Sequence, residues 1–585
     1  MSQQCFDFNG RPPIDECLPF SESLKLPKVP LCFNADYIVV GVGAAGAVLT
    51  RLLSENFNNS VLALEAGANH NQDTTIVDPV YANILPGKYH TQYFTDGTSV
   101  PQTDVNNRTF DYIQGKLLGG SSAINGMMYV RGTPSIYEEW QAAAGGDPDW
   151  GPAAVYETFK EMENFVNLSD LPSPTALTYH STEGLLAIRL APTPASLMAE
   201  KFANAVQHAT GFPTLTDYND PNSVLGGLTQ WQLYQHSDRS RSNSAYDYLH
   251  PGVMTTEGLG VDGRRLRVLF NSTALKVIFE GTTAVGVQFL YKGQFALAKA
   301  RKKVIVTTGI QSAGLLLRSG RGVPTLLTKA GIPVVFANSN VGQHMKNHTI
   351  VFALFTANPD DEGLPHDDPQ ALYTGGAFLN DSILGTTHRD FHYIGMWLAG
   401  TEDPMLMVIV ALLRPVSEGQ IQVINGDPMQ LPLVDDEYFH DPIDLEKFRN
   451  SLRILQQIGA ELTAIDPTYV LESPSPAILA DDDLLNDFIK DSLDQAHHWS
   501  GQCKMGTSAA DSVVDNTGHV FGVKNLIVAD ASIAPLPNDG NTSSHAYLAG
   551  LTIARKLGAR LRNTTQYTPS TIVSDEMIPI SGGGH

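Results

Sequence analysis

A glycine-rich turn between an apolar strand and a helix constrains this chain more than any other feature. Residues 36–41, DYIVVG, have the pattern of a buried strand, and Gly41-Val42-Gly43-Ala44-Ala45-Gly46 then opens a helical stretch to about Glu55. A second apolar strand pattern, Val61–Leu64, ends just before Glu65. Strand, turn, helix and strand form a βαβ unit, in which the helix N-terminus offers free N–H groups to a pyrophosphate. The sequence therefore predicts a dinucleotide-binding site.

Each position of this motif has its own physical role. Gly41 permits the tight turn, Gly43 lets the backbone approach the pyrophosphate, and Gly46 allows the helix to pack closely on the strand. The Glu65 carboxylate is expected to accept hydrogen bonds from both ribose hydroxyls and to repel a 2′-phosphate, which disfavours NADP. The motif by itself does not choose between NAD and FAD.

The composition narrows the possible partners. The 585 residues, 42% hydrophobic and 17% charged, suit an ordered protein with about two to four domains' worth of core. Lys and Arg number 38 against 61 Asp and Glu, and the net charge of −23 disfavours nucleic acid and membrane surfaces as partners. The longest apolar run, Met405–Leu413, is far shorter than the ~20 residues of a membrane-spanning helix. The four cysteines fit no zinc spacing, so we expect no metal.

A second glycine-rich segment distinguishes between NAD and FAD as the cofactor. Residues 115–138 are GKLLGGSSAINGMMYVRGTPSIYE, in which small residues let the backbone pass close to a flat ligand; a flexible Gly/Ser loop is the alternative. The segment resembles a signature of the glucose–methanol–choline (GMC) family of FAD oxidoreductases. The resemblance extends from about Asp36 to about Arg562, and it includes Arg241-Ser242, His348 after Val341-Gly342-Gln343, and the run 513–542.

The resemblance implies FAD as the cofactor and a mixed α/β fold. A Rossmann-like FAD-binding domain is expected beside a substrate domain built on an antiparallel sheet covered by helices. Strand patterns over 264–306, alternating patterns over 350–425 and helical patterns over 444–494 and 543–560 suit this fold. Because the two sheet patterns interleave, we expect discontinuous domains: an N-terminal extension (1–35), the FAD-binding domain (36–150, 236–348 and 496–565), the substrate domain (151–235 and 349–495) and a C-terminal tail (566–585).

Carried over residue by residue, the resemblance assigns contacts to FAD. The ADP half is expected to be held by Gly41, Gly43, Gly46 and Glu65, and the isoalloxazine to be lined by Gly119, Gly120, Asn125 and Gly126. Asp530 and Ala531 would meet the ribityl–pyrophosphate region, and Ala274 would lie near adenine, where the alignment can slide by one residue. Further contacts are expected at Ala44, Ala45, Ala66, Ser121, Met127, Asn541 and His545.

Two histidines lie where the family places its catalytic pair. His498 is followed by Gly501 in the family's His-x-x-Gly spacing, which favours it over the neighbouring His497, and His545 lies in the segment that opens the last predicted helix. Two histidines resemble one form of the pair, and other members combine a histidine with an asparagine. A neutral imidazole is a suitable base for a hydroxyl proton at physiological pH. We predict that His498 is the main base and His545 its hydrogen-bond partner, although the roles can be exchanged.

The reaction itself follows from this pair. Hydride transfer to flavin N5 leaves negative charge near N1 and the C2 carbonyl, and the N-terminus of the helix that begins near Thr542 is placed to stabilise it. The expected activity is oxidation of an alcohol, with O2 or another acceptor reoxidising the flavin. A hydroxynitrile lyase, which cleaves a cyanohydrin with FAD in a non-redox role, is the alternative. The intact motifs argue against a non-catalytic descendant.

The large side chains of the substrate sheet bear on the substrate, and the loops 72–110 and 360–388 can add polar groups. Ordinary core is one interpretation of these large side chains, and an apolar pocket suited to aryl or aliphatic alcohols more than to sugars is the other. These side chains are Phe391, Tyr393, Met396, Trp397, Met405 and Met407.

Processing motifs give an expectation about localisation. Asn-x-Ser/Thr occurs at Asn58, Asn107, Asn167, Asn271, Asn347, Asn380, Asn541 and Asn563, and the N-terminus carries no secretory signal. The acceptor sites favour a secreted glycoprotein.

Overall fold

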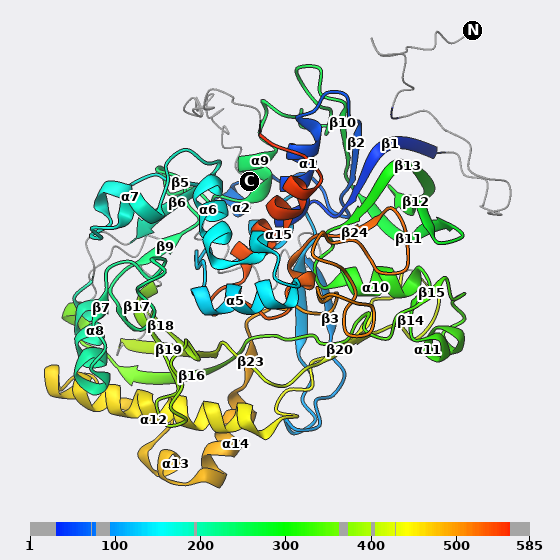
Figure 1. Ribbon diagram of the computed structural model, residues 1–585. Helices are drawn as coiled ribbons and strands as arrows, with labels where there is room; N and C mark the ends of the chain where they lie inside the picture. The colour runs from blue at the N-terminus through cyan, green and yellow to red at the C-terminus, as the bar shows by residue number, and fades with distance from the viewer. Residues whose placement is uncertain are drawn as a thin grey trace, which may run out of the picture.

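The two sheets expected from the sequence form separate layers (Figure 1). The computed structural model describes residues 14, 31–71, 73–77, 94–191, 196–361, 373–398, 404–427 and 429–561. The predicted C-terminal tail and almost all of the predicted N-terminal extension lie outside these residues. The domain boundaries stay predictions.

The first sheet is built around the predicted βαβ unit. Its order is β10–β2–β1–β13–β12–β11, and β24 joins it beside β13. The strands β10, β2, β1, β13 and β24 are parallel, whereas β11 and β12 extend the sheet as an antiparallel hairpin. The strands are β1 (Leu31–Val40), β2 (Val61–Leu64), β10 (Leu266–Leu269), β11 (Ser272–Glu280), β12 (Thr283–Tyr291), β13 (Gln294–Val306) and β24 (Leu526–Val528).

The predicted strand 36–41 is the second half of β1, which begins earlier because residues 31–35 also pair with β13. Both faces of β1 are covered, which explains the apolar run over residues 37–40. The helix α1 (Ala44–Ser54) follows the glycine turn and packs beside α15 (Ser543–Lys556). A Cβ atom at Gly46 would lie 2.0 Å from the Gly41 carbonyl oxygen, so only glycine fits where α1 begins.

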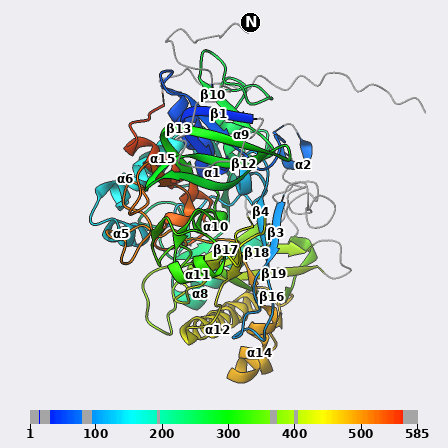
Figure 2. The same ribbon diagram turned by 90° about the vertical axis from the view of Figure 1, so that its right-hand side faces the viewer.

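The second sheet lies below the first in Figure 2, with α12 and α14 at the far end of the molecule. Its order is β22–β16–β19–β18–β17–β8–β7, with β23 also paired to β16, and all its pairs are antiparallel except β7–β8. The strands are β7 (Thr214–Leu215), β8 (Gly226–Leu228), β16 (Thr349–Thr356), β17 (Tyr373–Leu379), β18 (Phe391–Leu398), β19 (Met405–Leu412), β22 (Leu471–Ser473) and β23 (Asp494–Gln495).

Helices cover one face of this second sheet. They are α8 (Leu197–Thr210) and α12 (Pro442–Ile465), which bury a separate apolar core against β16, β18 and β19. The predicted helical region 444–494 is interrupted, because Leu471 pairs with Phe355 at the sheet edge before α13 (Pro476–Ala480) and α14 (Asp482–Ser492). The predicted fold class, a Rossmann-like sheet beside an antiparallel sheet covered by helices, is confirmed.

Smaller elements surround the two sheets. The helices are α2 (Thr74–Val77), α5 (Pro134–Ala143), α6 (Pro152–Met162), α7 (Ala176–Tyr179), α9 (Ser244–Tyr248), α10 (Gln311–Arg318) and α11 (Pro324–Lys329). The strands are β3 (Phe94–Thr98), β4 (Asp111–Gly115), β5 (Glu163–Phe165), β6 (Leu186–Ala191), β9 (Trp231–Leu233), β14 (Arg321–Gly322), β15 (Phe336–Ala337), β20 (Gln420–Gln422) and β21 (Leu433–Asp435). Within the described ranges, no helix is long and apolar enough to cross a membrane.

The glycine turn gives a matched pair of stability variants. We expect Gly46→Ala to lower the stability of the nucleotide-free protein by about 2 kcal/mol or more, because its Cβ overlaps the Gly41 carbonyl. Gly43→Ala is the control, since a Cβ there meets no protein atom closer than 3.7 Å. Thermal unfolding of both nucleotide-free variants measures the difference. Equal midpoints would show that the turn tolerates a side chain at residue 46.

Candidate active site

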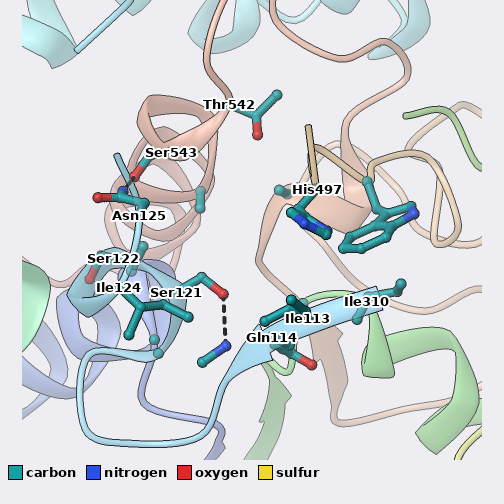
Figure 3. A pocket seen from close by; sticks show the side chains of 18 of the residues that line it. Ile113, Gln114, Ser121, Ser122, Ile124, Asn125, Ile310, His497, Thr542 and Ser543 are labelled. Atoms are coloured by element: carbon teal, nitrogen blue, oxygen red, sulfur yellow. Dashed lines mark hydrogen bonds between the residues drawn. The ribbon is translucent and has the colours of Figure 1, made fainter. Parts of the chain in front are cut away.

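A cavity of about 860 Å³ is bounded by the glycine turn of the first sheet and by the open face of the second. Figure 3 shows Ser121, Ser122, Ile124 and Asn125 on one side, His497 on the other, and Thr542 and Ser543 near the start of α15. Most of the predicted site residues line this cavity: Gly41, Gly43, Ala44, Ala45, Glu65, Ala66, Gly120, Ser121, Asn125, Gly126, Met127, Ala274, His498, Asp530, Ala531 and Asn541. Gly46, Gly119 and His545 are not among the lining residues.

The turn at the start of α1 is open to an anionic ligand. Gly43 is the N-cap of α1, and no side chain caps the free N–H groups of this 11-residue helix. The nearest protein atom to a Cβ at Gly43 is 3.7 Å away, at Gly120, so the protein itself leaves the space above the turn free. An open helix N-terminus beside a free backbone surface fits the diphosphate of a dinucleotide.

Glu65 holds the turn as well as lining the cavity. Its two carboxylate oxygens accept hydrogen bonds from the backbone N–H groups of Val42 and Gly67, each at 2.9 Å. Burial raises the pKa of Glu65 to about 7, against the opposing effect of these N–H donors. The Glu65 carboxylate, which the sequence predicts to contact ribose, therefore also holds the backbone of the turn. The sequence pattern did not indicate this second role.

Asp530, which also lines the cavity, likewise accepts hydrogen bonds from the turns around it. Its carboxylate accepts from the backbone N–H of Gly309 at 2.8 Å, from the Ser312 hydroxyl at 2.7 Å and from the backbone N–H of Ser532 at 2.9 Å. Burial raises the pKa of this carboxyl group. Asp530 thus ties two loops together at the cavity wall, in addition to the cofactor contact that the sequence predicts.

His498 is half-buried and hydrogen-bonded on both its backbone and its ring. Its backbone N–H donates to Asn347 Oδ1 at 2.8 Å, and its Nδ1 lies 2.9 Å from Nδ1 of His348. Burial lowers the pKa of His498 well below its usual value and that of His348 to about 3, so both rings are neutral at physiological pH. One proton occupies the bond between the two Nδ1 atoms, because each neutral ring carries a single N–H.

His545 lies behind the cavity wall. Its Nε2 is 3.2 Å from the Tyr137 hydroxyl, and its ring centroid is 4.5 Å from that of Trp140 on α5. Because Tyr137 donates its own proton to the Arg131 carbonyl, it accepts from His545 Nε2. Burial lowers the pKa of His545 to about 3.

The helical position explains this placement. α15 begins at Ser543, and Ser543 and Ala546 line the cavity, whereas residue 545 faces α5. His545 therefore does not lie on the cavity surface with His498, although the two rings remain close enough to interact electrostatically. Asn541 occupies that surface instead, and its buried Oδ1 has no hydrogen-bond partner among the described residues.

The neighbouring His497, the competing candidate, also lines the cavity. Its backbone has a positive φ of 58°, and its ring lies 5.3 Å from that of Trp499. No hydrogen bond fixes its ring within the described residues, and burial lowers its pKa. It lacks the ring partner that His498 has.

The second sheet gives the cavity an apolar wall with one polar end. Alternate residues of β18 face the cavity, namely His392, Ile394 and Met396, and Ile350, Ile409, Ala411 and Leu413 lie beside them. Of the six large side chains singled out in the sequence, Met396 alone is a lining residue; Phe391, Tyr393 and Trp397 belong to the core under α8 and α12. The interpretation as ordinary core is therefore correct for these three.

Two histidines that line the cavity, His348 and His392, are not among the site residues predicted from the sequence. His348 was part of the family resemblance, and His392 stands out only as the one histidine in an apolar strand. Both line the cavity, together with His498, although about 150 residues separate the segments of His348 and His498. The alternation of β18 is the pattern that would have placed His392 on the open face. No group of three potential metal ligands occurs within the described ranges.

Comparison with known proteins agrees with this geometry over most of the chain. Two family models, both described as GMC oxidoreductase, match residues 35–350 and 415–550. The chain is 29% identical over 566 residues to an oxygen-dependent choline dehydrogenase of Paraburkholderia xenovorans, covering 90% of this chain and 94% of the relative. It is 30% identical over 564 residues to the enzyme of the same name from Yersinia pseudotuberculosis, covering 90% and 93%.

Solved structures share the fold. Pyridoxine 4-oxidase from Mesorbium loti matches with a TM-score of 0.77 at 24% identity, covering 90% of this chain and 99% of that one. A fungal aryl-alcohol oxidase matches with a TM-score of 0.75 at 19% identity, covering 89% and 98%. At these identities the likeness concerns the fold alone. The two family matches decide the assignment: the chain belongs to the GMC oxidoreductase family and is an FAD-dependent oxidoreductase.

Proposed function

We propose that the protein oxidises an alcohol with an apolar substituent to the corresponding carbonyl compound. The observation that carries the proposal is a neutral, hydrogen-bonded His498 at the polar end of an otherwise apolar wall. FAD, when bound, takes up the two electrons and the hydrogen that leave the carbon and passes the electrons to O2 or another acceptor. The chain's own residues bind the alcohol, orient it and remove its hydroxyl proton.

The bond between His498 and His348 limits how the proton moves. For His498 to accept the hydroxyl proton at Nε2, its Nδ1 must carry the ring proton and donate it to His348 Nδ1. The proton of the neutral His348 ring is then on Nε2, which is buried and has no hydrogen-bond partner among the described residues. His348 then serves as a positioning residue, since it keeps an acceptor in front of His498 Nδ1 when that ring becomes positively charged.

Asn541 supplies the second polar group that the reaction needs. Its side chain lines the cavity with His498, and its Oδ1 has no partner among the described residues. The amide N–H of such a side chain is suited to donate to the substrate oxygen as negative charge develops on it. We therefore assign to Asn541 the role of second hydrogen-bonding residue, which the sequence predicts for His545.

The side chains that line the cavity on the second sheet indicate the substrate class. Ile350, Ile394 and Ile409 offer an apolar surface, and no acidic side chain from the described part of the second sheet lines the cavity. A quaternary ammonium group such as that of choline is held best by negative charge beside aromatic faces, and here Tyr373 and Trp499 line the cavity without an acidic neighbour from this sheet. We therefore infer aryl or aliphatic alcohols as substrates rather than choline or sugars.

An anaerobic substrate screen tests the proposal. We expect benzylic and medium-chain alcohols to bleach the flavin absorbance, with kcat/KM at least about tenfold above choline and glucose, since apolar contacts of this size are worth about 1.4 kcal/mol or more. Ile394→Glu should lower kcat/KM for these alcohols by a similar factor, because it places a charge on the wall. Ile383→Glu, at an exposed position, is the control. Preference for choline would contradict the substrate class, and cyanide release from a cyanohydrin without bleaching would instead identify lyase chemistry.

The histidine pair gives a second test, read as the rate of anaerobic flavin reduction. His498→Ala should slow reduction by about 100-fold or more, which is the usual contribution of a general base. His348→Ala should slow it by about tenfold, whereas His348→Asn should retain much of the rate because the Asn Oδ1 accepts from His498 Nδ1. Since burial lowers the pKa of both rings, the wild-type rate should stay nearly constant from about pH 8 to about pH 5.

The exposed His208→Ala is the control for these variants. A wild-type rate in His498→Ala would remove His498 as the base. Equal effects of His348→Ala and His348→Asn would remove the acceptor role of His348, without affecting the assignment of His498.

We also propose that the protein is secreted and glycosylated. Cys32 is disulfide-bonded, which is typical of oxidising compartments, and Asn58, Asn107 and Asn271 are exposed. Asn347 is buried, and its amide donates to Tyr438 and Gln495, so it offers no acceptor site in the folded protein.

Peptide mapping of the protein from its native source tests this localisation. We expect glycans on one or more of Asn58, Asn107 and Asn271 and none on Asn347, because the folded chain exposes the first three amides only. Unmodified asparagine at all three exposed sites would contradict the proposal.

A further inference from the structure

Among the residues that the structure describes, Arg241 is a buried cation without an acidic partner. Its Nε donates to the Ile76 carbonyl at 3.2 Å, and its Nη1 donates to the backbone and side-chain oxygens of Asn125 at 2.7 and 2.9 Å. Its Nη2 is buried and has no hydrogen-bond partner within the described ranges. Arg131 shows the contrast, because its guanidinium lies 2.6 Å from the Glu163 carboxylate.

Burial lowers the pKa of Arg241 to about 10, and within the described ranges Tyr373 and Tyr547, not a carboxylate, oppose this effect. The side chain is therefore still charged at physiological pH. A neutral donor would satisfy the same carbonyl oxygens at a lower cost of desolvation, because an unpaired buried charge is among the costliest groups in a protein interior. The charge itself calls for a counter-charge that the described residues do not provide.

The guanidinium lies directly behind the cavity wall. Asn125, which it holds, and Tyr373, which interacts with it electrostatically, both line the cavity. The Asn125 amide also donates to the Ser543 hydroxyl at 3.3 Å, at the start of the 14-residue helix α15, and Figure 3 shows these two side chains close together. No described side chain caps α15, so its positive end and the Arg241 cation converge on the same part of the cavity.

We propose that Arg241 provides the counter-charge for the negative charge that FAD gains on two-electron reduction, acting across the cavity wall at Asn125. Uptake of two electrons and one proton leaves the ring system with one negative charge, and a fixed cation nearby stabilises that form over the neutral oxidised one. The inference depends on FAD binding and not on the proposed alcohol substrate or on His498, so the two proposals fail separately.

Redox titration of the holoenzyme tests this role. Arg241→Gln and Arg241→Met should each lower the equilibrium constant for two-electron reduction of bound FAD at least tenfold, which corresponds to a fall in midpoint potential of about 30 mV. The dissociation constant of sulfite, which adds to oxidised flavin as an anion, should rise at least tenfold. Arg241→Lys, which keeps the charge, should stay within about threefold of the wild type on both measures.

Arg321→Gln is the matched control. Arg321 is also buried, its Nη2 donates to the Phe521 carbonyl, and it does not line the cavity. We expect its variant to retain the wild-type potential and sulfite affinity. An unchanged potential in both neutral Arg241 variants would overturn the proposal and leave Arg241 as an anchor of Asn125. Equal shifts in the Lys, Gln and Met variants would do the same.

A measurement on the wild type keeps the proposal testable if the neutral variants do not retain FAD. The absorbance spectrum of the fully reduced holoenzyme, followed from about pH 8 to about pH 6, reports whether the reduced flavin is anionic or neutral. The proposal expects the anionic spectrum throughout this range. A neutral reduced flavin at pH 7 would overturn it.

Discussion

Contact between backbone and backbone at the glycine turn fixes the position of everything else in the site. A Cβ at Gly120 would lie 2.8 Å from the Gly43 Cα, so the second glycine segment rests directly on the turn before α1. α15 approaches α1 equally closely, because a Cβ at Gly550 would lie 2.8 Å from the Ala45 Cα. Contacts of this kind leave no flexible side chains between the elements, so the turn, the loop and the helix start form one rigid edge of the cavity.

Two buried carboxylates secure this edge. Glu65 and Asp530 each accept several backbone or hydroxyl donors from turns that border the cavity, and burial raises the pKa of both. Each group is therefore held by donors that compensate for its removal from water. The chain's large acidic excess has no part in this, since the cavity owes its polarity to a few directed groups and not to the net charge.

The local motifs could be predicted from the sequence because each depends on residues close together in the chain. The βαβ unit, with β2 at Val61–Leu64 and α1 starting at Ala44, follows from the glycine pattern and two apolar runs. The position of His545 could not be predicted in this way, because its direction depends on where α15 begins and on the packing of α5 against it. The bond between His348 and His498 joins segments that lie 150 residues apart in the sequence, and no local pattern indicates which ring atoms meet.

The construction of the two cavity ends explains how one fold serves different substrates. The cofactor end is made of backbone groups and of side chains committed to holding that backbone, so a change at Glu65 or Asp530 disturbs the turns themselves. The substrate end is made of alternate residues on β18 and β19, whose neighbours in the chain face a separate core. A residue such as Ile394 can therefore change without altering the packing under α12.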